Sequence, residues 1–229
     1  MLRIYPLTAP SLKVASTPHR TSKYSSTVGS VASTATAIIG PQFVPPSLGA
    51  RSTQHAQLVA AAAPEMDALS ALSGESILLS VRVGLERVVI ASRPSTFSLR
   101  MDWPPGSRLP VHVGGMGVAL LALSPPGVIE EALKRADSGT LKGYTPSSMT
   151  TREALTRELE RVRRERVRVS KDDYARGEFS VAAPIVGADG YARGALTIAG
   201  FTARLDDERQ SRYASAVREA ANRIAAKLH

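Results

Sequence analysis

The sequence predicts an α+β fold in which an antiparallel sheet is covered by helices. Segments with strand-like alternation come in runs joined by short turns, instead of alternating singly with helices. Segments with apolar residues at helical spacing precede, separate and follow these runs. The composition is that of a globular chain with one domain and an appendage, since 43% of the 229 residues are hydrophobic and 21% are charged.

The N-terminal part does not share this patterning. Residues 1–38 are rich in Ser, Thr and Ala, show neither a helical nor a strand period, and precede the first acidic residue of the chain, Glu65. Three interpretations stay open for this irregular segment: a disordered tail, a transit peptide with few arginines, or a piece that is not the natural partner of the remaining chain. Residues 39–51 form a Pro-rich linker, in which Pro45 and Pro46 are expected to be extended.

The first half of the folded domain, which we expect over residues 52–229, combines one helix with a strand meander. The helix is predicted from Ser52 or Thr53 to about Leu72, and Pro64 should kink or divide it. Strands with one apolar face follow, joined by short turns typical of hairpins; they cover Ser76 to Val83, Arg87 to Ser92 and Phe97 to Met101.

The second half mixes helices with a hairpin. Three helices are predicted, and Ser148 or Thr150 should cap the third; they cover Gly115 to Leu123, Gly127 to Arg135 and Arg152 to Arg164. On the third helix we expect Glu153–Arg157 and Glu160–Arg164 ion pairs. An edge strand, a hairpin turning at Asp189–Gly190 and a final helix complete the domain, over Arg166 to Ser170, Phe179 to Val186, Tyr191 to Ala199 and Asp206 to Lys227.

Gly106 to Leu123 is the segment around which the rest is organised. It reads as a turn, a loop ending at His112, a glycine cluster and an apolar helix. Such a helix start offers free N–H groups and a positive dipole end, which suit the carboxylate of a small acid. The local pattern alone favours a packing turn between helix and sheet. His112 is likewise interpreted as a loop histidine bonded to backbone more readily than as a base.

The net charge of +9 permits contact with nucleic acid without demonstrating it. Seven arginines lie between Arg152 and Arg168, against four glutamates. Because no aromatic residues are interspersed among them, we interpret this stretch as a solvated, ion-paired helix face and not as a nucleic-acid surface.

No catalytic constellation is recognisable, so we expect no enzymatic activity, no metal and no cofactor. The chain has no cysteine, its four histidines are scattered, and no nucleotide-binding loop or nucleophile elbow is present. Adjacent acids at Asp172–Asp173 could pair for acid–base chemistry, but solvated carboxylates are the favoured interpretation. No apolar run approaches the length of a membrane span, so we expect a cytoplasmic protein without membrane contact.

Several motifs together resemble one family. They are GSRLPVHVGGMGVALLA, the Leu72–Ser76 segment, Gly177-x-x-Ser180-Val181-Ala182-Ala183-Pro184, Leu196–Gly200 and Arg204-Leu205-x-x-Glu208-Arg209. From about Gly40 to His229 the chain resembles the effector-binding part of IclR (isocitrate lyase regulator) transcriptional regulators. The resemblance implies a GAF-like domain with a curved antiparallel sheet, a small organic-acid effector, and a homodimer or homotetramer.

The residues alone leave two alternatives for Ser170, Ser180 and Thr197: they are hydrogen-bonded within strands, or they are directed into a pocket. The resemblance adds a set of effector-binding positions. The implied positions are Gly114, Gly115, Met116, Ser170, Ser180, Thr197 and Ala199. Many members carry Asp in place of Ser170 and Lys in place of Val118, which changes the ligand scheme. We expect Gly115→Val to abolish effector binding while leaving the fold largely intact.

The N-terminus departs from the family pattern. Such regulators begin with a winged helix-turn-helix, whereas only 39 residues precede Gly40 here, and they lack its patterned helices and wing. We hypothesise a shifted reading frame, a misplaced start or a degraded DNA-binding domain. Promoter DNA is then a partner only if a functional N-terminal domain exists, and the alternative is a stand-alone sensor module that does not bind DNA.

Overall fold

The computed structural model describes the backbone of residues 46–228 and the side chains from Thr53 onward. The expectations for residues 1–38 and for the linker up to residue 45 lie outside the described residues, as does His229. The described residues belong to one compact unit, Val44–His229. None of the helices in this part of the chain is long and apolar enough to cross a lipid bilayer.

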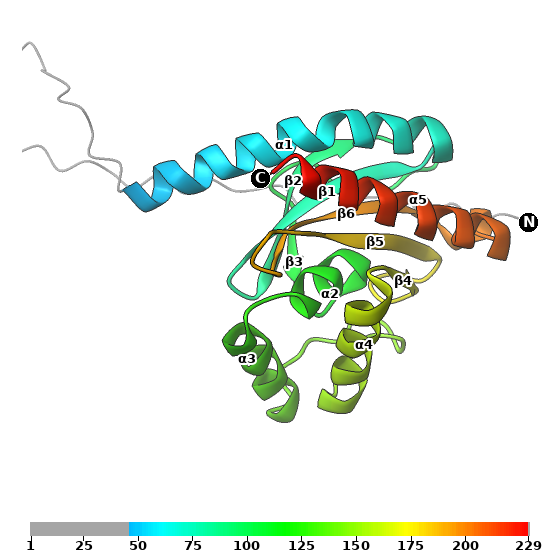
Figure 1. Cartoon of the computed structure of the whole chain (residues 1–229). Coiled ribbons are helices and arrows are strands. Elements are labelled where there is room, and N and C mark those ends of the chain that lie inside the picture. Colours follow the sequence, from blue (N-terminus) through cyan, green and yellow to red (C-terminus); the bar gives the residue numbers. More distant parts are fainter. Residues whose placement is uncertain (1–45, 229) are drawn as a thin grey trace, which may run out of the picture. The chain divides into compact units, whose positions relative to one another are not determined.

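A six-stranded antiparallel sheet forms the centre of the domain (Figure 1). Its spatial order is β3-β2-β1-β6-β5-β4, so that β1 and β6 join the first and second halves of the chain. The strands are β1 (Ser76–Val83), β2 (Glu86–Arg93), β3 (Arg108–Pro110), β4 (Arg168–Lys171), β5 (Glu178–Val186) and β6 (Ala192–Phe201). The α+β class and the curved antiparallel sheet predicted from the sequence are confirmed.

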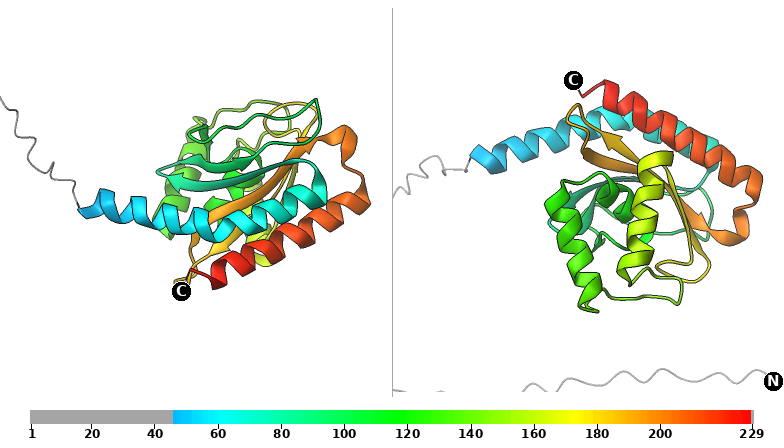
Figure 2. Two further views of the ribbon diagram at one scale, coloured as in Figure 1. Left: turned by 90° about the horizontal axis from the view of Figure 1, so that it is seen from above. Right: turned by 60° about the horizontal axis from the view of Figure 1, so that its bottom comes forward.

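Helices cover both faces of this sheet, as the two further views show (Figure 2). On one face lie α1 (Pro46–Ser73) and α5 (Asp207–Ala226), the latter preceded by a short 3-10 turn, Thr202–Arg204. On the other lie α2 (Gly114–Ala122), α3 (Pro126–Asp137) and α4 (Arg152–Glu165). The predicted buried stripe of α4, Leu155, Leu159 and Val162, is confirmed.

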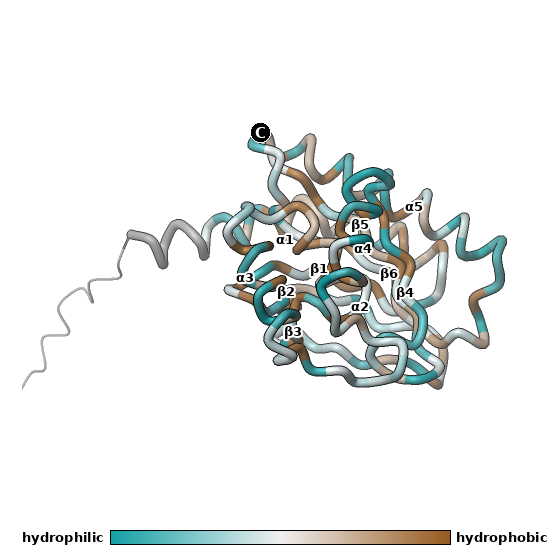
Figure 3. The backbone as a smooth tube through the Cα atoms, turned by 90° about the horizontal axis from the view of Figure 1, so that it is seen from below, coloured by the Kyte–Doolittle hydropathy of each residue, from teal (hydrophilic) through white to brown (hydrophobic). Residues whose placement is uncertain are grey.

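Because both faces are covered, the central strands are buried on both sides. In β1, Leu79 packs with α1 and α5, whereas Leu78 packs with Met116 at the start of α2. The apolar face predicted for this strand is confirmed for Ile77, Leu79 and Val81, but the opposite face is buried as well. Figure 3 shows the result, with hydrophobic stretches along the strands and hydrophilic residues on the outer turns.

The third strand is not where the sequence placed it. Residues 97–101 are irregular, and Phe97 and Leu99 are exposed, by 39% and 66%. The outer edge of β2 is instead paired by β3, with Arg87 opposite Leu109. β3 pairs with only the first three residues of β2, and residues 97–101 pair with no strand. Strand propensity takes effect only where side chains pack against cross-strand neighbours, which Phe97 and Leu99 do not find.

One helix start and one helix cap also differ from prediction. Helix α1 begins at Pro46, not at Ser52 or Thr53, because proline is tolerated at the first helical position, where its missing N–H has no partner to lose. It continues through Pro64 without division. Helix α4 is capped by Thr151, whose side chain accepts the N–H of Ala154.

The cationic face of α4 is ion-paired, although by other partners than predicted. Arg161 bonds Glu158 and Glu165, and among the described residues neither of the two expected pairs forms. Arg152, at the helix start, reaches Asp137 and Glu130 on α3. Ion pairing is therefore observed for three of the seven arginines, Arg152, Arg161 and Arg168, whereas the specific pairs expected are wrong.

A buried ion pair joins two of the sequence motifs. Both carboxylate oxygens of Glu75, a residue only 1% exposed, accept bonds from Arg204, at 2.6 and 2.7 Å. The Arg204 guanidinium lies over the rings of Phe97, at 4.4 Å, and Phe201, at 5.5 Å. A Cβ on Gly200 would overlap the Glu75 carboxylate, so glycine there makes room for the pair.

Candidate functional site

A cavity lies between the sheet and the glycine loop that starts α2. Its empty volume is ≈ 370 Å³ with the open side included, of which ≈ 30 Å³ admits the centre of a water-sized sphere. One water needs about 10–15 Å³ by the second measure, so the cavity as it stands has room for about two waters. It is lined by Arg87, Met101, Trp103, Leu109, Gly114, Met116, Ser170, Asp173, Tyr174, Glu178, Phe179, Ser180 and Ala199.

Five of the seven effector positions predicted from the sequence line this cavity. They are Gly114, Met116, Ser170, Ser180 and Ala199. They come from the start of α2 and from β4, β5 and β6, three strands that are consecutive in the sequence and adjacent in the sheet. The structure therefore brings these residues together, and their role toward a ligand stays a prediction.

Gly115 supports the cavity wall without lining it. Its N–H donates to the Ser180 side-chain oxygen at 2.8 Å, so this donor of the helix start is already used. A Cβ on Gly115 would lie 2.7 Å from that oxygen and 3.2 Å from the Ser180 carbonyl oxygen. The expectation that Gly115→Val would leave the fold largely intact is therefore wrong, because valine would collide with β5.

Gly117 plays the packing role that the local pattern favoured. A Cβ there would lie 2.6 to 2.9 Å from three backbone atoms of Val111. The glycine cluster thus lets α2 approach both its own preceding loop and β5. The packing-turn interpretation and the cavity-wall interpretation hold for different glycines of the same cluster.

Thr197 lies away from the cavity. It is fully buried in β6 and shares a sheet face with Ala195 and Ala199, which pack against α2. Its hydroxyl oxygen has no hydrogen-bond partner within the described residues. Of the three polar strand residues, Ser170 and Ser180 reach the cavity and Thr197 does not.

The sequence interpretation missed the most unusual residue of the cavity, Arg87 on β2. It is only 2% exposed, and its Nε and one terminal nitrogen have no hydrogen-bond partner within the described part of the chain. The guanidinium carbon lies 4.8 Å from the centre of the Trp103 ring. Burial lowers the pKa of Arg87 to about 10, against the opposing effects of Tyr174 and Glu178, so it stays charged at neutral pH.

Glu178, at the start of β5, is the cavity's second titratable group. Burial raises its pKa to about 7, and the nearby positive charge of Arg87 opposes that rise. No ion pair joins the two among the residues described, although both line the cavity. Tyr174 closes this end, with its ring 5.3 Å from Trp103 in a T-shaped contact.

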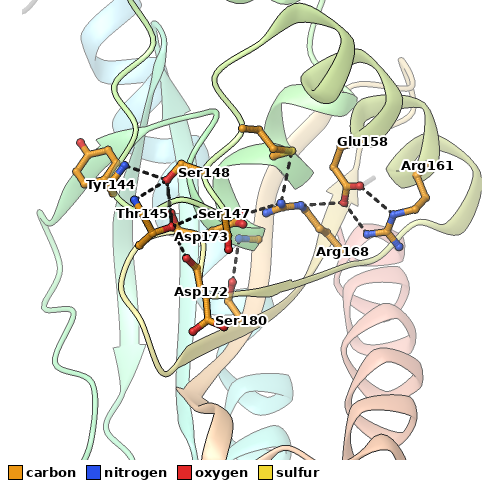
Figure 4. Close-up of polar contacts among 12 residues, drawn as sticks. Tyr144, Thr145, Ser147, Ser148, Glu158, Arg161, Arg168, Asp172, Asp173 and Ser180 are labelled. Carbon is orange, nitrogen blue, oxygen red and sulfur yellow. Dashed lines mark hydrogen bonds and ion pairs between the residues drawn. The ribbon is translucent and has the colours of Figure 1, made fainter.

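The adjacent acids Asp172 and Asp173 form a structural network and not a solvated pair (Figure 4). Asp173 is 8% exposed and accepts a bond from Arg168 at 2.6 Å, while Arg168 also donates to Glu158. Asp172 has a positive φ of 61° and accepts the N–H of Gly177. Solvation of both carboxylates was thus the wrong expectation, and each is committed to holding the loop between β4 and β5.

Two hydroxyl groups secure the same loop from the segment before α4. The Thr145 hydroxyl donates to the carbonyl of Asp172, and the Ser148 hydroxyl donates to that of Asp173 at 2.7 Å (Figure 4). Ser148, predicted as a possible helix cap, therefore ties two loops together instead.

His112 has the structural role that the sequence favoured. It is 5% exposed, and its Nε2 lies 3.0 Å from the carbonyl oxygen of Lys142. Burial lowers its pKa, which disfavours the charged form. Within residues 46–228, no group of three or more His, Asp or Glu side chains has the arrangement to hold a metal ion.

The chemistry of the cavity is that of binding. It combines one buried cation without a hydrogen-bonded counter-ion, one carboxyl group that titrates near neutrality, two serines and a wall of Met, Trp and Phe side chains. An anionic ligand with a small apolar body fits this set of groups.

Comparison with known proteins gives a consistent result. The family described as bacterial transcriptional regulator IclR C-terminal matches residues 50–226. The HTH-type transcriptional repressors AllR of Salmonella typhi and Escherichia coli K12 are 30% and 31% identical over 182 residues. That region is 80% of this chain and 66% of each relative, so the chain spans just under two thirds of their length.

Solved structures share the fold. The Thermotoga maritima IclR structure superposes with a TM-score of 0.71 and 25% identity, over 80% of this chain and 73% of that one. The C-terminal domain of the E. coli transcriptional regulator KdgR gives a TM-score of 0.66 and 26% identity, over 75% of this chain and 98% of that domain.

Proposed function

Because this chain belongs to the IclR family of bacterial transcriptional regulators through its C-terminal domain, we propose that residues 52–229 sense a small organic acid. The observation that carries the proposal is the cavity, where a buried arginine with unused donors meets the predicted effector positions. Gly114, Met116, Ser170, Ser180 and Ala199 are proposed to contact the effector, with Gly115 supporting Ser180. Thr197 is proposed to act only through packing.

The proposed mechanism is a population shift. An acid that fills the cavity contacts β2, α2, β4, β5 and β6 together, so it favours the conformation in which these elements are closest. It can shift an equilibrium only by the difference in its affinity for the two states. We propose that the states are arrangements of a cytoplasmic homodimer or homotetramer, as the resemblance implies, with DNA affinity as the output.

A thermal-shift screen of the full chain tests the proposal. Short aliphatic and aromatic monocarboxylic acids are compared with their amides at the same concentration. Since a ligand that binds only the folded state stabilises it by mass action, at least one acid should raise the Tm in a dose-dependent way. A screen in which no acid raises the Tm more than its amide would contradict acid sensing.

The regulatory part is tested separately. Electrophoretic mobility shift with DNA from the region upstream of the chain's own gene, with and without the acid found above, measures whether DNA binding responds to it. A specific complex that the acid strengthens or weakens supports a regulator. Acid binding without any DNA complex supports the stand-alone sensor module instead.

A further inference from the structure

We propose that Arg87 is the residue that recognises the effector, by binding the carboxylate of a short monocarboxylic acid, and that Glu178 takes up a proton when that acid binds. The inference rests on the proposed function, since it assigns the binding chemistry of the same cavity. It differs from the sequence-based ligand scheme, which placed the carboxylate at the glycine loop and did not include either residue.

The Arg87 guanidinium is held in place but lacks hydrogen-bond acceptors. Its ring contact with Trp103 fixes the guanidinium at the cavity, yet two of its nitrogens have no hydrogen-bond partner among the described residues. The comparable buried arginine, Arg168, is 4% exposed and donates to both Glu158 and Asp173, which leaves one nitrogen, Nη1, without a partner among the described residues. A buried donor without an acceptor is costly, so an acceptor brought in by a ligand is strongly favoured there.

The charges in the cavity also favour Arg87 as the binding group. Of the carboxylates that line the cavity, Asp173 is committed to Arg168, and Glu178 makes no ion pair with Arg87 within the described part of the chain. Arg87 is thus the cation available to a ligand anion, and a guanidinium presents several N–H donors that match the geometry of a carboxylate. The N-terminus of α2 is a weaker binding site for the ligand carboxylate than Arg87, because the Gly115 N–H already donates to Ser180.

The volume of the cavity sets the size of the acid. Room for about two waters suits an acid of two or three carbon atoms without rearrangement of the walls. Part of the lining is apolar, formed by Met101, Met116 and Ala199 of one hydrophobic cluster, and suits a methyl or ethyl group. Acetate and propionate are therefore the appropriate probes.

The proposed proton uptake by Glu178 follows from the groups that would surround the bound carboxylate. Arg87 from β2, Glu178 from β5, and Tyr174 and Asp173 from the loop between β4 and β5 are the titratable groups that line the cavity, with Arg168 behind Asp173. A carboxylate at Arg87 would repel an ionised Glu178 and accept a hydrogen bond from a protonated one. Because the pKa of Glu178 is already near neutrality, binding should raise it further and draw a proton from solvent.

Isothermal titration calorimetry of the full chain with propionate, and with propionamide as the neutral analogue, tests the assignment. We expect Arg87→Gln to weaken propionate binding at least tenfold and Arg87→Lys to retain part of it. The matched control is Arg108→Gln, since Arg108 is exposed on the neighbouring strand, bonds Glu86 and does not line the cavity. That variant should bind as the wild type does.

Repeating the titration at pH 7.5 in buffers of different ionisation enthalpy measures proton uptake and does not depend on the Arg87 variants being folded. Wild type should take up a fraction of a proton per propionate bound, and Glu178→Gln should take up none. Propionate binding that survives Arg87→Gln unchanged, or that proceeds without proton uptake, overturns this inference and leaves acid sensing intact. Failure of every acid in the thermal-shift screen would overturn acid sensing itself.

Discussion

Removing Arg204 should destabilise the domain more than removing one partner of an exposed ion pair would. The Arg204→Met variant leaves the Glu75 carboxylate 1% exposed with neither of its two short bonds, at 2.6 and 2.7 Å. Breaking a buried pair from one side costs about 3–5 kcal/mol, because an uncompensated charge stays buried. For a domain of this size that corresponds to a fall in Tm of about 6–20 °C.

Urea unfolding followed by far-UV circular dichroism at pH 7.5 measures this cost. The matched double variant, Glu75→Met with Arg204→Met, should recover much of the loss, since replacing a whole buried pair by apolar groups is often close to neutral. The exposed pair Arg93–Asp67 supplies the control, and Arg93→Met should cost under about 1 kcal/mol. If Arg204→Met lies within about 1 kcal/mol of wild type, the reasoning is refuted.

Three further outcomes are expected from the structure. Gly117→Ala should lose about 1–3 kcal/mol of stability in urea unfolding, because its Cβ meets the Val111 backbone, whereas Gly127→Ala, with open space around it, should lose none. Glu178 contributes stability that is present below pH 4.5 and lost as pH rises through about 7, since its folded-state pKa is raised. Relative to wild type, Glu178→Gln should therefore gain about 1–2 kcal/mol between pH 5 and pH 8, a figure reduced for partial solvent screening; a constant difference would contradict this. Arg87→Met, which removes two unpartnered buried donors, should raise the Tm of the ligand-free protein, and a lowered Tm would show that these donors are satisfied.

The fold could be predicted because its elements are determined locally. Apolar spacing located every helix of residues 46–228 and five of the six strands to within a few residues, and the Asp189–Gly190 turn fixed the hairpin of β5 and β6. The sixth strand, β3, has only three residues, too few to show an alternating pattern. Residues 97–101 have strand-like residues, but strand propensity depends on packing against neighbours, and Phe97 and Leu99 lie exposed.

The site was predictable only in part, for a related reason. The glycine loop and the two serines are recognisable in the sequence, whereas Arg87 reads as an ordinary solvent-facing strand residue. Its direction depends on register, and the pairing of β1 with β2 shifts there: Leu79 pairs with Ala91 but Ser80 with Val89, so Ile90 of β2 is the extra residue. Asp173 was misread similarly, since its burial depends on Arg168 reaching it from β4.

Helix α1 has a mechanical consequence. Among its residues from Thr53 onward, the first buried side chain is Leu58, about 18 Å along the helix axis from Pro46. A rotation of about 10° around Leu58 would carry Pro46 through about 3 Å. Small changes in how α1 rests on β1 and β2 would therefore be magnified at Pro46, where the helix begins.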